Sequence, residues 1–241
     1  SSAASDVYKR QVHGDNKGLV MPPRVAQIQV VLVPCGLGVK VAQEVKDEVN
    51  ETCARIARAL TARDVRAHAD LRDNYNPGFK FNDWELRGVP LRLEIGPKDL
   101  SSKATIAVRR DTGAKSQLPL DSLEQSVPAL LDTIHNDMFK RAEAEFDAHR
   151  KIVTDWDSFT PTLNDKNHVI IPWCGREECE DAIKDRSARI ATEGEPQDER
   201  APSMGAKSLC IPFDQTPYPP IASHTCPQCG HTSKERTMFG R

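Results

Sequence analysis

Four cysteines arranged as two short pairs are the residues of this sequence best suited to chemistry. Cys174 and Cys179 lie in PWCGREECED, and Cys226 and Cys229 lie in HTCPQCGHT. Two closely spaced pairs that converge in space supply the four thiolates that a tetrahedral zinc ion requires. A zinc ion held by four cysteines has no coordination position open to a substrate, so it stabilises the fold rather than a reaction. The sequence therefore predicts a structural zinc site.

The spacing of Cys226 and Cys229 is also found in thiol redox enzymes, where the first cysteine opens a helix whose amino end lowers the thiol pKa. Here the pair lies between a Tyr-Pro-Pro segment and Gly230, a sequence typical of a turn. His224 and His231 flank the pair and are alternative zinc ligands, although four cysteines already complete the site. Zinc is the favoured interpretation, and a dithiol redox function is the alternative.

The composition excludes a membrane-spanning or secreted protein. The chain has 241 residues, 38% of them hydrophobic and 5% aromatic, which is enough for two modest cores. No apolar run approaches the roughly 20 residues of a bilayer span, and no apolar segment of a secretion signal follows the N-terminus. The other three cysteines, Cys35, Cys53 and Cys210, lie in apolar segments and are expected to be buried free thiols. These features predict a soluble, cytoplasmic protein with no membrane partner.

Positive charge gathers in one part of the chain. The formal net charge is −2, but the segment 54–110 carries 12 Lys and Arg against 7 Asp and Glu. A basic segment in a mildly acidic chain is compatible with a surface that binds nucleic acid. Charge alone does not distinguish such a surface from an ordinary solvated face.

Alternating strands and helices are predicted for the first part of the chain. Residues 27–36 are a near-continuous β-branched run, typical of a strand covered on both faces, and 41–61 repeat apolar residues every three or four positions, as a helix does. In a strand over 90–95, Arg92 and Glu94 face away from the core that the intervening leucines enter. The other predicted elements are strands over 65–71, 105–110 and 115–118, a short helix over 81–86, and a long helix that starts after Ser126 with Pro128 in its first turn.

A second, smaller domain follows. It is predicted to contain a helix near 155–163, a strand over 168–174, a helix over 180–188, a polar loop, a strand over 208–213 and the cysteine-bearing turn. Residues 1–11 show neither helix nor strand periodicity and are expected to be an extraneous or disordered tail, and 12–25 a connector stiffened by prolines. The predicted fold class is α/β, with domains over 26–150 and 151–241.

Three motifs carry a resemblance to a known family. The segment DLRDNYNPGFKFNDWELRGVPLRLEIGPKDL (70–100) resembles the anticodon-binding domain of the eukaryotic and archaeal type of prolyl-tRNA synthetase. The connector HGDNKGLVMPPRVA resembles the segment that follows the catalytic domain in that family, and SMGAKSLCIPF with the cysteine pairs resembles its zinc-binding C-terminal domain. The resemblance implies a mixed-sheet class II anticodon-binding domain followed by a smaller zinc-binding α/β domain.

The resemblance implies a ligase that activates proline with ATP and transfers it to proline tRNA, as a cytoplasmic homodimer. None of the three class II catalytic motifs is present in this chain. We therefore expect no catalytic residue, no bound ATP and no prolyl-adenylate formation here, but recognition of the tRNA and stabilisation of the enzyme. A non-catalytic tRNA-binding or regulatory module built from the same domains is the alternative.

The family's anticodon-reading residues fall on Glu85, Arg92 and Lys98 of this sequence. The proline anticodon presents two guanines, whose N–H groups a carboxylate accepts and whose O6 and N7 atoms accept from Arg or Lys. Unpaired RNA bases are read along these edges. Tyr75 and Phe79 lie among the basic residues of this stretch and are candidates for stacking on a base.

Overall fold

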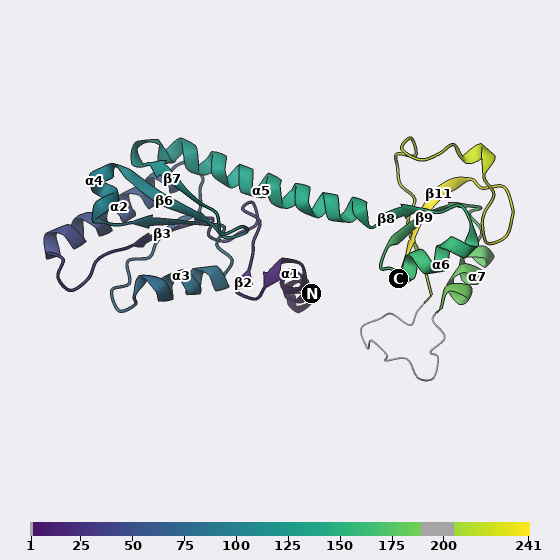
Figure 1. The fold of residues 1–241 in the computed structure, drawn as a ribbon, viewed down its shortest axis with the longest axis horizontal. Coiled ribbons are helices and arrows are strands. Elements are labelled where there is room, and N and C mark those ends of the chain that lie inside the picture. The colour runs from purple at the N-terminus through teal and green to yellow at the C-terminus, as the bar shows by residue number, and fades with distance from the viewer. Residues whose placement is uncertain (1, 189–204) are drawn as a thin grey trace. The chain divides into compact units, whose positions relative to one another are not determined.

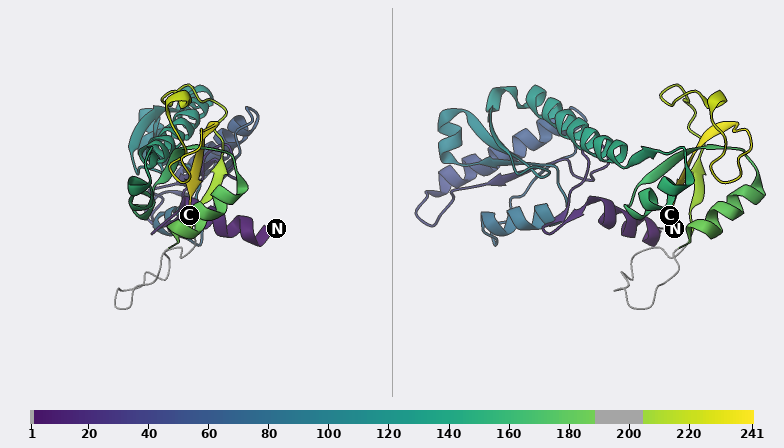
Figure 2. Two further views of the ribbon diagram at one scale, coloured as in Figure 1. Left: turned by 90° about the vertical axis from the view of Figure 1, so that its right-hand side faces the viewer. Right: turned by 45° about the vertical axis from the view of Figure 1, so that its right-hand side comes forward.

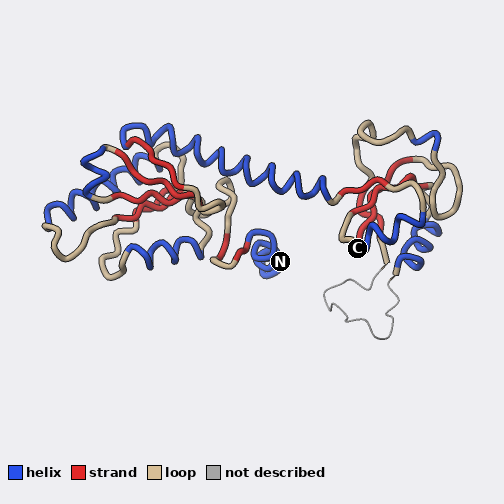
Figure 3. The backbone as a smooth tube through the Cα atoms, viewed as in Figure 1, coloured by secondary structure: helices blue, strands red, loops and turns tan. Residues whose placement is uncertain are grey.

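The computed structural model describes residues 2–188 and 205–241, which fold as two compact units divided between Arg141 and Ala142 (Figure 1). Helix α5 (Leu123–Ala148) crosses this division. Each unit has its own sheet with helices packed against it (Figure 3). The polar loop predicted before the last strands falls on 189–204, outside the described residues. No helix in the described part of the chain is both long and apolar enough to cross a bilayer.

The first unit is built on a mixed five-stranded sheet. Its strands, in order across the sheet, are β4 (Ala67–Ala69), β3 (Val30–Pro34), β5 (Leu91–Ile95), β6 (Ala104–Arg109) and β7 (Lys115–Pro119). Strand β3 is parallel to both β4 and β5, whereas β5, β6 and β7 are antiparallel to one another in turn. The predicted strands of this part of the chain are confirmed, with shorter bounds at β3 and β4.

Helices cover both faces of this sheet, which explains the unbroken apolar run of β3. Helix α2 (Gln43–Thr61) and the first half of α5 form one core with Leu91, Leu93 and Ile95. Helix α3 (Pro77–Leu86) covers the opposite face and packs Trp84 against Val31 and Val33. A second view shows α3 and α5 on opposite sides of the sheet (Figure 2). The predicted alternation along β5 is confirmed, because its odd-numbered residues are buried and Arg92 and Glu94 are half-buried on the α3 side.

Three helical predictions for this unit need correction. Helix α3 begins at Pro77, four residues before the predicted start at residue 81, because Asn76 caps its first turn and proline is tolerated there. Residues 2–13 form helix α1 (Ser2–His13), where no periodic structure is predicted, because Ala, Lys, Arg and Gln favour a helix even without an apolar stripe. Helix α5 begins at Leu123, four residues before the predicted start at residue 127, because buried Leu123 and Val127 anchor an additional turn and leave Pro128 inside the helix. The hairpin of β1 (Gly14–Asp15) and β2 (Gly18–Leu19) follows α1.

The second unit contains a four-stranded sheet in the order β10 (Lys207–Cys210), β11 (Glu235–Gly240), β9 (His168–Trp173) and β8 (Arg150–Ile152). Strand β11 is antiparallel to both of its neighbours, and β8 is parallel to β9. Helices α6 (Trp156–Asn164) and α7 (Glu177–Ser187) are confirmed within a few residues of their predicted bounds. The sequence predicts neither β8 nor β11, although β11 lies inside the sheet and buries five of its six residues.

Candidate functional site

The four predicted zinc ligands meet at one point in the second unit. The Sγ atoms of Cys174, Cys179, Cys226 and Cys229 all lie within 4.8 Å of one another. Cys179 Sγ is 3.6 Å from Cys226 Sγ, and Cys229 Sγ is 3.6 Å from Cys174 Sγ. Four sulfurs about 2.3 Å from a tetrahedral zinc lie about 3.8 Å apart, so this donor set fits the ion. The predicted convergence of the two pairs is confirmed.

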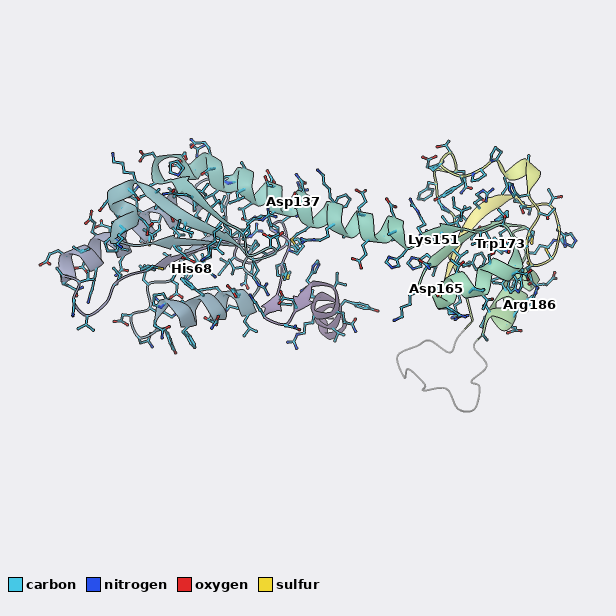
Figure 4. The ribbon with its side chains drawn as sticks, in the orientation of Figure 1. His68, Asp137, Lys151, Asp165, Trp173 and Arg186 are labelled. Carbon is cyan, nitrogen blue, oxygen red and sulfur yellow. The ribbon has the colours of Figure 1, made fainter. Side chains whose placement is uncertain are left out.

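Local backbone geometry aims the sulfurs inward. Cys174 follows β9, and Gly175 then takes a φ of +73°, which lets the chain turn sharply towards α7, where Cys179 lies in the first turns. In the second pair, Gly230 N–H donates to the carbonyl of Cys226 at 2.8 Å, and Gly230 has a φ of +70°. Both bends use the left-handed region that glycine adopts without strain. Trp173 at the end of β9 and Arg186 on α7 mark these elements in Figure 4.

The electrostatics of the cluster favour a cation at its centre. Cys174, Cys179 and Cys226 are buried, and Cys229 is the most exposed of the four. Burial, and then the hydrogen bond with Cys226, raise the pKa of Cys179 well above its ordinary value. Thiols this close ionise together only when a cation offsets their mutual repulsion, as Zn²⁺ does when it deprotonates its ligands. The residues present therefore fit a zinc ion closed by four thiolates.

The flanking histidines contact other groups. His231 Nε2 lies 3.0 Å from a guanidinium nitrogen of Arg176, and His224 Nδ1 lies 3.0 Å from the carbonyl of Pro220. Among residues 2–188 and 205–241, the group of side chains that could hold a metal ion consists of the four cysteines and includes neither histidine. Because Cys174, Cys179 and Cys226 also belong to the apolar core of this unit, a metal here would tie β9, α7 and the loop before β11 together.

The three other cysteines differ in how far they are buried. Cys53 is buried and Cys35 is half-buried, and burial raises the pKa of each thiol to about 12. Cys210 is exposed, which corrects the prediction that all three are buried. The pairing of β10 with β11 shifts register between Ser208 and Cys210, and such an irregularity turns the following side chain outward.

Two of the three predicted base-reading residues lie in direct contact in the first unit. Arg92 Nη1 donates to Glu85 Oε1 at 2.8 Å, and Arg92 Nε donates to Glu94 Oε1 at 3.0 Å. The guanidinium of Arg92 also lies 4.0 Å from the centre of the Phe81 ring. The side chain of Arg92 is only 12% exposed and that of Glu85 is 26% exposed, and both line a pocket of about 350 Å³.

Lys98 occupies a different position. It is exposed in the first turn of helix α4 (Pro97–Ser102), just beyond the carboxyl end of β5. No ion pair joins it to Glu85 among the residues that the structure describes. The structure thus brings Glu85 and Arg92 together on the α3 side of the sheet and leaves Lys98 at the edge where β5 ends.

A buried carboxylate, which is not among the predicted site residues, organises this face of the sheet. Asp70 is 1% exposed and accepts hydrogen bonds from Arg72 Nε at 2.8 Å and from the indole of Trp84 at 2.8 Å. Although burial alone raises a carboxyl pKa, these hydrogen bonds lower the pKa of Asp70 to about 2. Lys80 donates to the carbonyl of Asp70, which connects α3 to the end of β4. The signal in the sequence is an Asp that directly follows a strand run.

Comparison with known proteins identifies both units. Residues 29–130 match the family described as "Anticodon binding domain", and residues 156–241 match "Prolyl-tRNA synthetase, C-terminal". The chain is 49% identical over 232 residues to the bifunctional glutamate/proline-tRNA ligase of Drosophila melanogaster, with 95% of this chain and 13% of that protein covered. It is 42% identical over 229 residues to the cytoplasmic proline-tRNA ligase of Arabidopsis thaliana, with 95% of this chain and 40% of that protein covered.

The similarity extends to three-dimensional structure. Prolyl-tRNA synthetase from Cryptosporidium parvum, solved with L-proline and AMP, superposes with a TM-score of 0.79 at 36% identity, covering 95% of this chain and 44% of that one. The chain thus spans less than half the length of these relatives. The order of the two matched domains, the four-cysteine cluster and the shared fold agree with the resemblance seen in the sequence. This chain carries the anticodon-binding domain and the C-terminal domain of a eukaryotic-type prolyl-tRNA synthetase.

Proposed function

We propose that the first unit binds the anticodon loop of proline tRNA and reads its two guanines with Glu85, Arg92 and Lys98. The contact between Arg92 and Glu85 is the observation that carries this proposal. Arg92 offers a planar fork of donors suited to O6 and N7 of one guanine, and Glu85 accepts from the N–H groups of a guanine Watson–Crick edge.

The free protein keeps this pair ready for exchange. Arg92 and Glu85 form an ion pair with each other, so neither charge is left without a partner in the pocket. Contacts with Phe81 and Glu94 fix the plane of the Arg92 guanidinium. A base that enters the pocket replaces part of the Arg92–Glu85 contact with hydrogen bonds of the same type. Such pre-ordering reduces the side-chain entropy lost on binding. A base without matching donors and acceptors leaves the pair partly desolvated and unpaired, which supplies specificity.

Lys98 has a simpler part in the proposal. Its exposed ammonium on α4 is a point charge without the geometric restriction of a guanidinium. It can donate to O6 or N7 of the second guanine or to the adjacent phosphate.

We further propose that the chain functions within a proline-tRNA ligase, which activates proline with ATP and transfers it to tRNA. The relatives named above carry that activity in their names, and each has additional sequence that this chain does not cover. Residues 26–150 and 151–241 would be the anticodon-binding and zinc-binding domains, 12–25 the connector from a catalytic domain, and 1–11 a tail outside the family. Homodimerisation and a cytoplasmic location follow from the same assignment; the Arabidopsis relative is named cytoplasmic.

In the second unit we propose a structural zinc ion bound by Cys174, Cys179, Cys226 and Cys229. A bound zinc would supply folding energy and keep all four thiols ionised and unavailable for redox exchange. Metal analysis and thiol labelling distinguish the two assignments. One zinc per chain, together with four unreactive cluster thiols, would support the structural site over a dithiol redox protein. A metal-free chain with a reactive Cys226–Cys229 pair would support the redox protein.

Binding of Arg92→Ala to two RNAs tests the reading function. The RNAs are the anticodon stem-loop of proline tRNA and the same stem-loop with one anticodon guanine changed to adenine. If Arg92 reads that guanine, the substitution weakens binding of the cognate RNA by about 1–3 kcal/mol and of the variant RNA by much less. Equal weakening for both RNAs would remove Arg92 from base reading. Arg58→Ala is the control for loss of one arginine, because Arg58 is exposed on α2 and does not line the pocket that contains Arg92.

A further inference from the structure

A second, larger pocket lies at the carboxyl edge of the first sheet. It has a volume of about 930 Å³ and is lined by residues of the segments 34–50 and 71–80. We call it the switch-point pocket, because the chain leaves β3 towards α2 on one face and leaves the neighbouring β4 towards α3 on the other face. Loops that part to opposite faces at the carboxyl ends of parallel strands form the usual ligand crevice of an open α/β sheet.

The charges around the switch-point pocket are mainly positive. Lys46, Arg72 and Lys80 line it, and Asp73 is its one acidic lining residue. Arg72 is committed to Asp70 and Asp83, and Lys80 donates to the backbone of Asp70. Lys46 differs, because the described residues include no carboxylate that forms an ion pair with it. Lys46 is therefore the cation available for an anionic ligand.

The rest of the lining suits RNA more than a compact anion. Asn50 and Asn74 offer amides for sugar or base edges without selecting one base. Tyr75 lines the pocket and stacks on Phe79 with ring centres 4.3 Å apart, and the two rings are 40% and 46% exposed. Exposed aromatic rings beside a positive groove are typical of surfaces that bind single-stranded nucleic acid.

The position of the pocket relates it to the proposed reading residues. Strands β4, β3 and β5 are parallel neighbours, so the switch-point pocket and Lys98 lie at the same edge of the sheet. Strands β4 and β5 are separated by two strand spacings, about 10 Å. That span is short enough for neighbouring nucleotides of one loop to reach both places.

We propose that the switch-point pocket binds a backbone phosphate of an anticodon-loop nucleotide next to the bases that are read, with Lys46 as its cation. This inference rests on the proposed function of the first unit. The contact is independent of base identity, so it adds affinity and positions the loop, whereas Glu85 and Arg92 supply selectivity.

Lys46→Gln in the full chain tests this contact, with Lys140→Gln as a matched control. Lys140 lies on α5, is exposed and does not line the pocket. Loss of one phosphate contact makes the slope of the logarithm of the binding constant against the logarithm of the salt concentration less steep by about 0.7. Relative to 1 M salt, this corresponds to about fivefold weaker binding at 0.1 M salt. We expect this loss for Lys46→Gln with both the cognate stem-loop and its guanine-to-adenine variant. A loss no larger than that of Lys140→Gln, or a loss confined to one anticodon, would overturn the proposal.

Neutral methylphosphonate groups, placed one at a time along the anticodon loop, locate the phosphate. At the contacted position, the neutral group should lower the affinity of the RNA for the unsubstituted protein. It should not further lower the affinity for Lys46→Gln, because the methylphosphonate and the substitution remove the same interaction. If no position shows this loss of effect, Lys46 contacts no phosphate. Excess UMP, which carries a phosphate but no guanine, should leave the RNA complex intact. Displacement of the RNA by UMP would reassign the switch-point pocket to free nucleotides.

The same measurements separate the two proposals. If the unsubstituted chain binds the cognate and variant stem-loops equally, base reading by Glu85 and Arg92 fails. The Lys46 contact is then still judged by its salt slope and by the methylphosphonate positions. If discrimination persists while Lys46→Gln matches its control, the reading function stands and the switch-point pocket does not bind the loop.

Discussion

Removal of zinc is predicted to unfold the second unit and leave the first unit intact. A four-cysteine zinc site contributes about 10–16 kcal/mol of apparent binding free energy at neutral pH. A domain of this size is stable by only about 5–15 kcal/mol in total. Because three of the four ligands are part of the unit's apolar core, loss of the ion also leaves that core without a bond between β9 and the loop before β11.

Hydrogen exchange resolved by peptide measures this effect, because it reports each unit separately. With a chelator present, amides of β9 and β11 should exchange at rates close to those of an unfolded chain, while amides of β3 and β5 keep their protection. Cys226→Ser should act in the same direction, since a quarter of the zinc binding energy is about 3 kcal/mol. Cys210→Ser is the control, because Cys210 is exposed and outside the cluster. Unchanged protection of β9 and β11 in the metal-free chain would refute the structural role of the site.

Three further outcomes are expected. Asp70, whose pKa is held at about 2, contributes stability on the order of 2 kcal/mol that is present above about pH 4 and is lost as the pH falls towards 2. Asp70→Asn should reduce the pH dependence seen in urea unfolding of the first unit by about this amount, and the lowered pKa values of Asp15 and Asp111 supply the remainder. Ile134→Ala removes a fully buried side chain of α5 and should lower the free energy of unfolding of that unit by about 2–5 kcal/mol, whereas exposed Phe139→Ala should change it little. Gly230→Ala places a side chain at a φ of +70° and should weaken zinc binding about fivefold in a chelator competition, from about 1 kcal/mol of strain; equal affinity would show that the turn tolerates a side chain.

The parts of this fold with strong local patterns could be predicted from the sequence. The alternation along β5, the apolar stripe of α2 and the two cysteine pairs each carry their own signal, and the structure confirms all three. In each case the residues that make the pattern are also the residues that pack or bind together. The spacing along the chain therefore predicts which side chains share one buried face or one site.

Other features depend on partners that are distant in sequence. Strand β11 contains a charged residue, Arg236, that is only 1% exposed, and it is a strand because β9 and β10 flank it. Asp70 looks like an ordinary polar residue after a strand until the fold brings Trp84 against it. The outward turn of Cys210 arises from an irregular pairing with β11. Tertiary contacts decide the environment of these three positions, and the place of Asp70 directly after a strand run is the one local signal among them.

Binding of the unmodified chain to proline-tRNA anticodon stem-loops tests the central claim most directly. Each of the two anticodon guanines is changed in turn to adenine, and affinities are compared at one fixed salt concentration. A surface that reads guanine edges should lose about 1–3 kcal/mol for each change, which is roughly 5-fold to 150-fold in Kd. Equal affinities for the three RNAs would contradict the claim that this unit reads the anticodon.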